Sequence, residues 1–413
     1  MPELFRLTTL AEALQRLEAA LAGDFLQGRL EVEQLPLLAA AGRIIAADII
    51  SPVDLPPFAR SIMDGFAVRA QDTFGATEGL PAQLKLAGEV KMGQAAEAHV
   101  SPGEAVKIPT GGMLPAGADA VVMIEYSHPW GEELIEIARS VAPGENIVQV
   151  GEDLQRGDPM LHAGAKLRPQ DIGALAGVGI TTVPVYRRPR LGLLSTGNEI
   201  VSPETEPAPG QIRDINAYAL TAAAGALGVE VTHFGIARDR REELRAQLAE
   251  AFAASDIVIL SGGTSVGIED MVADCIGELG EPGILVHGLN IKPGKPVIIA
   301  VAQGKPVFGL PGHPASALLT FDLVVAPLLK KMTGNNALRQ RVSALLSRNL
   351  PSAPGREDFY RVRLEEREGQ LYAVPILGKS ALISTLLQAD GLLHIAAERE
   401  GLYQGEEVEV ELF

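Results

Sequence analysis

The sequence is poor in cysteine and in aromatic residues, and each shortage excludes a class of structure. The single cysteine, Cys275, rules out an internal disulfide and any metal site built from several cysteines. It lies in the apolar pattern MVADCIGEL (271–279), which indicates a thiol packed in a core rather than a nucleophile. Aromatic residues make up 4% of the chain, so its cores must consist mainly of Leu, Ile, Val and Ala.

Positive charge is also scarce. The chain has 35 Lys and Arg residues against 52 Asp and Glu residues, which gives a formal net charge of −17. This balance argues against an extended nucleic-acid surface, so we expect no nucleic-acid partner. An anionic ligand would have to be bound by a local cluster of basic side chains and backbone N–H groups.

Long apolar runs are missing as well. No run approaches the roughly 20 residues that a helix needs to cross a bilayer. The first residues, MPELFRLTTLAEAL, lack the basic region followed by an apolar block that marks a signal peptide. We therefore expect a cytoplasmic protein that does not contact a membrane.

The 413 residues are too many for one ordinary core. Segment 8–22 places leucines on one helical face after a plausible N-cap at Thr9, and 168–180 has a second helical pattern. We expect this second helix to pack with the first helices, which makes the β-rich segment between them an insertion. The predicted domains are a mixed α/β linker domain 1–51 plus 154–184, a β-rich module 52–153, an α/β domain 185–331, and a C-terminal β-barrel-like domain 332–413.

Strands and helices alternate within the predicted α/β domain. Repeated βα units predict a doubly wound parallel sheet with helices on both faces and ligand sites at the carboxyl ends of its strands. The predicted strands are 188–196, 229–237, 256–260, 297–301 and 306–310, and the predicted helices are 216–227, 240–254, 269–279 and 313–329.

Three of these strand ends carry polar loops with glycine: LLSTGNE (193–199), SGGTSVGIED (261–270) and GLPGHPASA (309–317). Glycine lets a backbone approach a ligand closely, and N–H groups at a helix start attract phosphate. Asp270 could hold a divalent cation that in turn binds the phosphate. The alternative is a set of tight βα turns with capping Ser and Thr residues, and no loop matches a nucleotide-binding fingerprint.

A basic turn follows in NIKPGKP (290–296), where a Pro-Gly pair separates Lys292 from Lys295. The alternative is an exposed turn with solvated lysines. Because the turn lies between two apolar segments of an acidic protein, its position favours a role in binding an anion.

Single polar residues in the β module and in the tail carry weaker signals. Asp64 lies among apolar residues in FARSIMDGFAV, Thr110 begins a Thr-Gly-Gly loop, and Asp153 comes near the end of the module. Acids in loops are usually turn formers. In the tail, Arg356 is typical of an exposed arginine and Ser380 of a helix cap.

Taken in order, these segments resemble the molybdopterin molybdenumtransferase family, which is related to the E domain of gephyrin. The resemblance rests on SIMDGFAV, IPTGGMLPAGADAVV, GED, STGNE, SGGTSVGIED, NIKPGKP and GLPGHPASA, and it extends over essentially the whole chain. It implies four domains and an elongated homodimer with an active site between the α/β domain of one subunit and the β module of the other. It also implies that the protein inserts molybdate into adenylylated molybdopterin and releases AMP, with Mg²⁺ or another divalent cation.

The resemblance also implies roles for individual residues. Asp270 and, more weakly, Glu199 and Asp239 would hold the cation or position water. The catalytic set would be Asp64, Thr110, Asp153, Glu199, Asp239 and Asp270. Adenylylated molybdopterin would contact Ser195, Thr196, Gly197, Gly262, Gly263, Thr264, Pro311, Gly312, His313 and Pro314, and molybdate would contact Ser265, Lys292, Lys295, Arg356 and Ser380.

The chain departs from the family pattern at Gly288, where many relatives carry a basic residue, and at Ala381 and His313. The sequence leaves open whether the oxyanion is molybdate or tungstate. It also leaves two other functions open: a molybdopterin adenylyltransferase, which the α/β domain alone also resembles, and a non-catalytic scaffold. Other proteins of molybdenum cofactor synthesis are possible partners.

Overall fold

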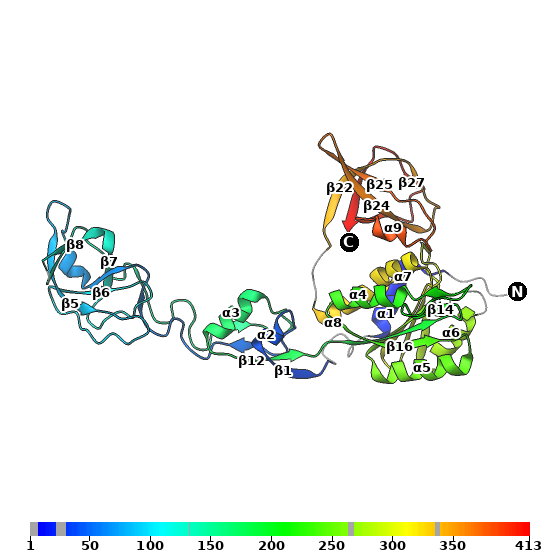
Figure 1. The fold of residues 1–413 in the computed structure, drawn as a ribbon, viewed down its shortest axis with the longest axis horizontal. Coiled ribbons are helices and arrows are strands. Elements are labelled where there is room, and N and C mark those ends of the chain that lie inside the picture. The colour runs from blue at the N-terminus through cyan, green and yellow to red at the C-terminus, as the bar shows by residue number, and fades with distance from the viewer. Residues whose placement is uncertain (1–6, 22–29, 132, 263–267, 335–338) are drawn as a thin grey trace. The chain divides into compact units, whose positions relative to one another are not determined.

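The computed structural model describes residues 7–21, 30–131, 133–262, 268–334 and 339–413. The chain forms two compact units: Met1–Glu33 with Tyr186–Phe413, and Gln34–Val185 (Figure 1). The first contains the α/β sheet and the C-terminal barrel. The second contains a small mixed core and a β-rich module.

The mixed core of the second unit is formed by chain segments on either side of the β module. Helix α2 (Leu37–Ala40) contacts helix α3 (Pro169–Gly177), and strand β2 (Ile49–Ile50) pairs with β11 (Pro159–Leu161). Their shared apolar core includes Leu37, Ile45, Leu175 and Val183. The predicted second helix is therefore confirmed as α3, and it packs with α2.

The β module contains a six-stranded sheet in the order β7-β4-β6-β5-β9-β8, which confirms its β-rich character. Asp64 directly precedes β4, a strand that is buried along its whole length. A Cβ atom at Gly65 would lie 1.9 Å from the carbonyl oxygen of Val122, so only glycine allows β4 and β7 to pair here. The strands are β4 (Gly65–Val68), β5 (Ala82–Glu89), β6 (Glu104–Ile108), β7 (Ala120–Met123), β8 (Ser127–Trp130) and β9 (Leu134–Ile137).

The α/β sheet of the first unit has the order β16-β13-β17-β21-β20-β18. Its first four strands are parallel, as predicted. The strands are β13 (Arg190–Thr196), β16 (Glu230–Ala237), β17 (Ile257–Gly262), β18 (Pro282–His287), β20 (Ile298–Ala302) and β21 (Lys305–Leu310). The all-parallel prediction is wrong at one edge, because β20 runs antiparallel to both β21 and β18.

The cause of this reversal is a hairpin between β20 and β21. Only Gln303 and Gly304 join the two strands, and both have positive φ values, 49° and 76°. A two-residue connection forces neighbouring strands to run antiparallel, and positive φ at both positions is the conformation of a type I′ hairpin turn. Strand β18, which pairs with β20 at this edge, was not predicted from the sequence.

Two layers of helices cover the sheet, so the doubly wound architecture is confirmed. Helices α5 (Arg241–Ala254) and α6 (Ile268–Gly277) pack on one face, with Leu248 and Cys275 in their core. Burial raises the pKa of the Cys275 thiol, as expected for a packed core residue. The other face is covered by α1 (Leu10–Ala20), α4 (Asn216–Ala226), α7 (Pro314–Thr320) and α8 (Ala326–Thr333).

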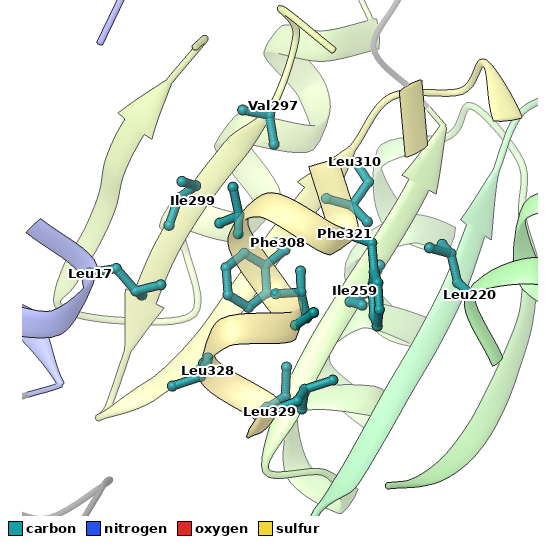
Figure 2. Close-up of a cluster of buried hydrophobic side chains, with 14 of the residues drawn as sticks. Leu17, Leu220, Ile259, Val297, Ile299, Phe308, Leu310, Phe321, Leu328 and Leu329 are labelled. Atoms are coloured by element: carbon teal, nitrogen blue, oxygen red, sulfur yellow. The ribbon is translucent and has the colours of Figure 1, made fainter. Parts of the chain in front are cut away.

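Helix α1 belongs to this second layer. Thr9 is its N-cap and accepts a hydrogen bond from the Glu12 N–H at 3.2 Å. Its Leu17 side chain joins a core with Ile259, Phe308 and others (Figure 2). The prediction that α1 packs with α3 is wrong, because the apolar face of α1 packs on the α/β sheet. The four domain boundaries themselves stay a prediction.

The C-terminal part is a closed barrel. Each strand pairs with the next in the order β24-β25-β22-β28-β26, and β26 pairs back with β24. Strand β19 (Ile291–Lys292) pairs with β24 and so ties the lysine turn to the barrel. The barrel strands are β22 (Arg341–Leu346), β24 (Glu357–Arg367), β25 (Gln370–Pro375), β26 (Gly391–Ile395) and β28 (Glu407–Leu412). Within the described part of the chain, every helix is too short or too polar to cross a membrane.

Candidate active site

A cavity of about 1060 Å³ opens at the carboxyl ends of β13, β17 and β21, where the sequence predicted a ligand site. The lysine turn and parts of the C-terminal barrel complete its wall. The cavity brings together many of the predicted residues: Ser195, Thr196, Glu199, Gly262, Lys292, Lys295, Pro311, Gly312, His313, Pro314, Arg356 and Ser380. Gly263, Thr264 and Ser265 lie outside the described residues.

Glycines allow the strand ends to converge. Gly262 has a φ of 103°, and a Cβ atom on it would lie 2.3 Å from the carbonyl oxygen of Thr196. A Cβ atom on Gly312 would lie 3.6 Å from the Gly262 Cα. Gly197, which does not line the cavity, would bring a Cβ atom within 2.9 Å of the Glu199 carboxylate. The close approach of the two backbones requires glycine at 262, whereas at 197 it is the positive φ of 144° that favours glycine.

Asp214 and Asn216 are among the cavity residues that were not predicted. The Ser195 hydroxyl donates to Asp214 Oδ2 at 2.5 Å, and Asp214 Oδ1 accepts from the Ala217 N–H at 3.0 Å. Asp214 therefore links the end of β13 to the first turn of α4. The available signal was the run DINAYAL, in which an acid and an amide come just before a helical pattern.

The lysine turn is anchored rather than loosely solvated. The Leu289 N–H donates to the Lys295 carbonyl at 2.9 Å. A Cβ atom on Gly294 would lie 2.6 Å from the Thr320 side chain, so the turn packs tightly against α7. Both lysine side chains are exposed and line the cavity. A fixed backbone with exposed ammonium groups fits an anion site.

Arg356 enters the cavity from the barrel. Its Nε donates to Asp358 Oδ1 at 2.7 Å and its Nη2 donates to Asp358 Oδ2 at 3.1 Å. This pairing raises the pKa of Arg356 against the opposing effect of burial. Asp358 is only 1% exposed, and sequence reasoning missed it because nothing in the pattern marks its burial. Arg356 is therefore an oriented cation rather than a freely exposed arginine.

Replacing Asp358 by asparagine should release Arg356. The loss of one partner from a buried charged pair should destabilise the fold by about 1–3 kcal/mol. It should also weaken the binding of molybdate, the role that the resemblance implies for Arg356, because the guanidinium loses its fixed orientation. Thermal unfolding and molybdate titration of the variant test both effects. The matched control is Glu357→Gln on the same strand, whose carboxylate pairs with His394; equal behaviour of the two variants would contradict the assigned role.

His313, just after β21, contacts Ser380 from the C-terminal part of the chain. The His313 Nδ1 lies 2.9 Å from the Ser380 hydroxyl, and the Ala315 N–H donates to the Ser380 carbonyl at 3.3 Å. Ser380 does not cap a helix as predicted, because α9 (Ser384–Leu387) starts four residues later. Two other residues depart from the family pattern. Ala381 lines the cavity, whereas Gly288, which has a φ of 97°, does not.

The predicted carboxylates are dispersed. Glu199 lines the cavity; Asp239 accepts a hydrogen bond from the Asn198 N–H at 3.3 Å, and exposed Asp270 lies in the first turn of α6 outside the cavity wall. The described residues contain no group of three or more His, Cys, Asp or Glu side chains that could hold a metal.

In the second unit, Asp64 and Thr110 are brought together. Asp64 Oδ1 accepts hydrogen bonds from the Thr110 N–H at 2.7 Å and from the Thr110 hydroxyl at 3.1 Å. The backbone bond first, and then the hydroxyl bond, lowers the pKa of Asp64. Asp64 is therefore an exposed, ionised carboxylate with a fixed orientation. Asp153 is also exposed, and its N–H donates to the Leu55 carbonyl at 3.1 Å.

Comparison with known proteins agrees with this architecture along the whole chain. Residues 8–179 match the MoeA N-terminal region (domain I and II), residues 192–331 a probable molybdopterin binding domain, and residues 343–413 the MoeA C-terminal region (domain IV). The fold and the cavity thus define an α/β protein of the molybdopterin-binding class with additional β domains.

Individual relatives identify the family within this class. The chain is 35% identical over 388 residues to the molybdopterin molybdenumtransferase of Haemophilus influenzae, with 93% of this chain and 94% of the relative covered. It is 34% identical over 383 residues to molybdopterin molybdenumtransferase 2 of Mycobacterium tuberculosis, with 91% and 94% covered. A solved structure of a molybdopterin biosynthesis MoeA protein from Pyrococcus horikosii superposes with a TM-score of 0.84 at 40% identity, with 98% and 99% covered. The chain belongs to the molybdopterin molybdenumtransferase (MoeA) family, transferases of molybdenum cofactor biosynthesis.

Proposed function

We propose that this protein inserts molybdate into adenylylated molybdopterin and releases AMP. The observation that carries this proposal is the cavity at the strand ends, which combines closely packed glycine loops with Lys292, Lys295 and Arg356. A phosphate-bearing substrate and an oxyanion repel each other in solution. A site that brings them together must supply fixed positive charge, and this cavity has it.

The residues of the chain have separate tasks in this reaction. The glycine loops let the phosphates approach the backbone, with Ser195, Thr196 and the 311–314 segment along the substrate. Gly197 does not line the cavity and would contribute through the conformation of the turn after β13. The lysine turn, Arg356 and Ser380 bind molybdate and neutralise its charge. No protein nucleophile is needed, because positioning and electrostatic stabilisation suffice.

A divalent cation such as Mg²⁺ forms part of the proposal. Mg²⁺ is commonly bound by one or two carboxylates together with substrate phosphates rather than by a complete protein cage. Glu199 in the cavity wall and Asp270 at the start of α6 are the proposed carboxylates, with Asp239 as a further candidate. This arrangement accords with the dispersed carboxylates of the described residues, because the substrate would complete the site.

We further propose a cytoplasmic homodimer in which Asp64, Thr110 and Asp153 of one subunit complete the site of the other. The hydrogen bonds that fix Asp64 support this assignment, because a catalytic carboxylate must have a defined orientation and charge. Other proteins of molybdenum cofactor synthesis are proposed as partners that supply the substrate and receive the product.

Release of AMP from adenylylated molybdopterin tests the proposal. The purified protein is assayed with Mg²⁺ and with molybdate, tungstate or no added oxyanion, and a parallel series contains a chelator. We expect release that depends on molybdate and is lost with the chelator. AMP release that depends on tungstate and not on molybdate would mean that tungstate is the oxyanion inserted. No release from folded protein would contradict the transferase and favour the scaffold, and formation of adenylylated product from ATP and free molybdopterin would identify an adenylyltransferase.

A further inference from the structure

Arg356 starts from a loop of the C-terminal part of the chain rather than from a strand. Residues 352–356 lie between β23 (Leu350–Pro351) and β24, and those at 353–355 are exposed. The ion pair with Asp358 orients the guanidinium, but it does not hold the backbone from which the side chain extends. An exposed loop keeps one position only where hydrogen bonds hold its backbone. The position of Arg356 in the cavity therefore depends on the contacts of this loop.

Gly355, the residue before Arg356, is held at both of its peptide groups. Its N–H donates to the Ala397 carbonyl at 2.7 Å. Its carbonyl accepts a hydrogen bond from the side-chain Nδ2 of Asn290, which directly precedes β19. The Gly355 carbonyl and the Arg356 N–H belong to one planar peptide group. Asn290 therefore holds the peptide group from which Arg356 begins.

Asn290 is itself held by its backbone. Its N–H donates to the Thr8 carbonyl at 2.9 Å, and its carbonyl accepts from the Glu357 N–H at 3.2 Å. Thr8 is 6% exposed and comes just before the N-cap of α1. Because the acceptor at Gly355 is a carbonyl, the end of the amide that faces it must be the nitrogen, which donates. Three segments far apart in the sequence therefore meet at Asn290: the start of α1, the base of the lysine turn and the start of β24.

The Asn290 bond joins the two chain segments that carry Lys292 and Arg356. Lys292 follows Asn290 closely in the sequence, and both residues line the cavity with Arg356. The backbone pairing of β19 with β24 lies after Arg356 along the chain, whereas the bond from Asn290 reaches the residue before it. The two contacts therefore hold Arg356 from both directions. Cations that bind one oxyanion together need a separation that is fixed to within about 0.5 Å.

We propose that Asn290 is a positioning residue of the oxyanion site: its side chain sets the separation between Arg356 and the lysine turn, and thereby the affinity for molybdate. This inference rests on the proposed function, which assigns molybdate to these cations. Asn290 lines the cavity, but its amide acts through the Gly355 peptide group rather than on a reacting atom. Loss of the amide should therefore weaken the binding of molybdate and leave the binding of adenylylated molybdopterin unchanged.

Asn290→Ala tests this assignment. The variant keeps both backbone hydrogen bonds of residue 290 and loses the side-chain bond to Gly355. The molybdate concentration for half-maximal AMP release should rise about threefold to tenfold, the effect of one neutral hydrogen bond. The KM for adenylylated molybdopterin at saturating molybdate should stay unchanged. A purely structural role of Asn290 would instead change both constants together.

A double-mutant cycle with Arg356→Ala shows whether Asn290 acts through Arg356. Arg356→Ala alone should raise the molybdate requirement, since the cavity loses one of its cations. Adding Asn290→Ala to that variant should cause no further rise, because no guanidinium remains to be positioned. Additive effects of the two substitutions would mean that Asn290 contacts the oxyanion directly, and they would overturn the positioning role.

Gln303→Ala is the matched control. The Gln303 Nε2 also donates to a backbone carbonyl, that of Leu279 at 2.8 Å, and Gln303 does not line the cavity. Each variant loses one hydrogen bond from a side-chain amide to a carbonyl, so each should lower the unfolding temperature slightly. The molybdate requirement should change in Asn290→Ala and stay at the wild-type value in Gln303→Ala.

The outcomes separate this inference from the proposed function. A folded Asn290→Ala protein with the wild-type molybdate requirement would overturn the positioning role and leave the transferase reaction standing. An equal rise in the KM for adenylylated molybdopterin, or an equal rise in the molybdate requirement of Gln303→Ala, would have the same consequence. A wild-type protein without molybdate-dependent AMP release would overturn the proposed function and, with it, this inference.

Discussion

Replacing Lys292 by alanine should raise the molybdate concentration needed for half-maximal AMP release by about tenfold to a hundredfold. A hydrogen bond from an ammonium group to an anion contributes about 1.5–3 kcal/mol, and each 1.4 kcal/mol is a factor of ten. Lys292 is exposed at the cavity wall, so its removal should hardly change the free energy of unfolding. The effect should therefore appear in binding and not in stability.

The backbone on either side of Lys292 is held by contacts that do not involve the Lys292 side chain. Residues Ile291 and Lys292 pair with Glu357 and Asp358 of the barrel, and Gly294 packs against Thr320. These contacts involve the backbone or other side chains and persist in the variant. The change therefore removes one ammonium group from a wall that is otherwise intact.

Molybdate titration of AMP release measures the effect, with Lys85→Ala as the control. Lys85 is an exposed lysine of β5 and does not line the cavity, so its loss should leave the titration unchanged. Lys292→Arg, which keeps the charge, should recover part of the affinity. An unchanged molybdate requirement in Lys292→Ala would remove this residue from the oxyanion site.

Local patterns were sufficient to predict the positions of the loops that form the cavity. The alternation of apolar segments and turns located β13, β17 and β21, and a glycine after a buried strand marked each place where backbones meet. Such features are encoded within a few residues of the chain. The lysine turn was predictable for the same reason.

Features that depend on distant contacts could not be predicted. The Asn216 side chain donates a hydrogen bond to the Gly312 carbonyl, 96 residues away. No pattern near Asn216 in the sequence indicates this contact. Asp358 is only two residues from Arg356, but its role depends on burial in the barrel. The packing of α1 on the α/β sheet also depends on which apolar face it meets, and an amphipathic pattern does not specify the partner.

Replacing Gly262 by alanine should destabilise the protein by about 2–4 kcal/mol and abolish most AMP release. Two effects add: a left-handed φ of 103° and a Cβ atom 2.3 Å from the Thr196 carbonyl oxygen. Non-bonded atoms do not approach so closely, so the ends of β13 and β17 must separate. Because Thr196 and Gly262 both line the cavity, the separation should displace the glycine loop that the proposed function assigns to the substrate phosphates.

The control Gly277→Ala distinguishes this clash from the general effect of adding a methyl group. Gly277 is the last residue of α6, lacks a positive φ, and has no atom within 4 Å of an added Cβ atom. Alanine there should leave AMP release unchanged and stabilise the helix by up to about 1 kcal/mol. The measurements are the unfolding temperature and the rate of AMP release of both variants, each compared with the wild type. A Gly262→Ala protein with wild-type stability and turnover would mean that the strand ends do not converge at the Thr196 carbonyl, and the cavity would then lack the close backbone approach on which phosphate binding depends.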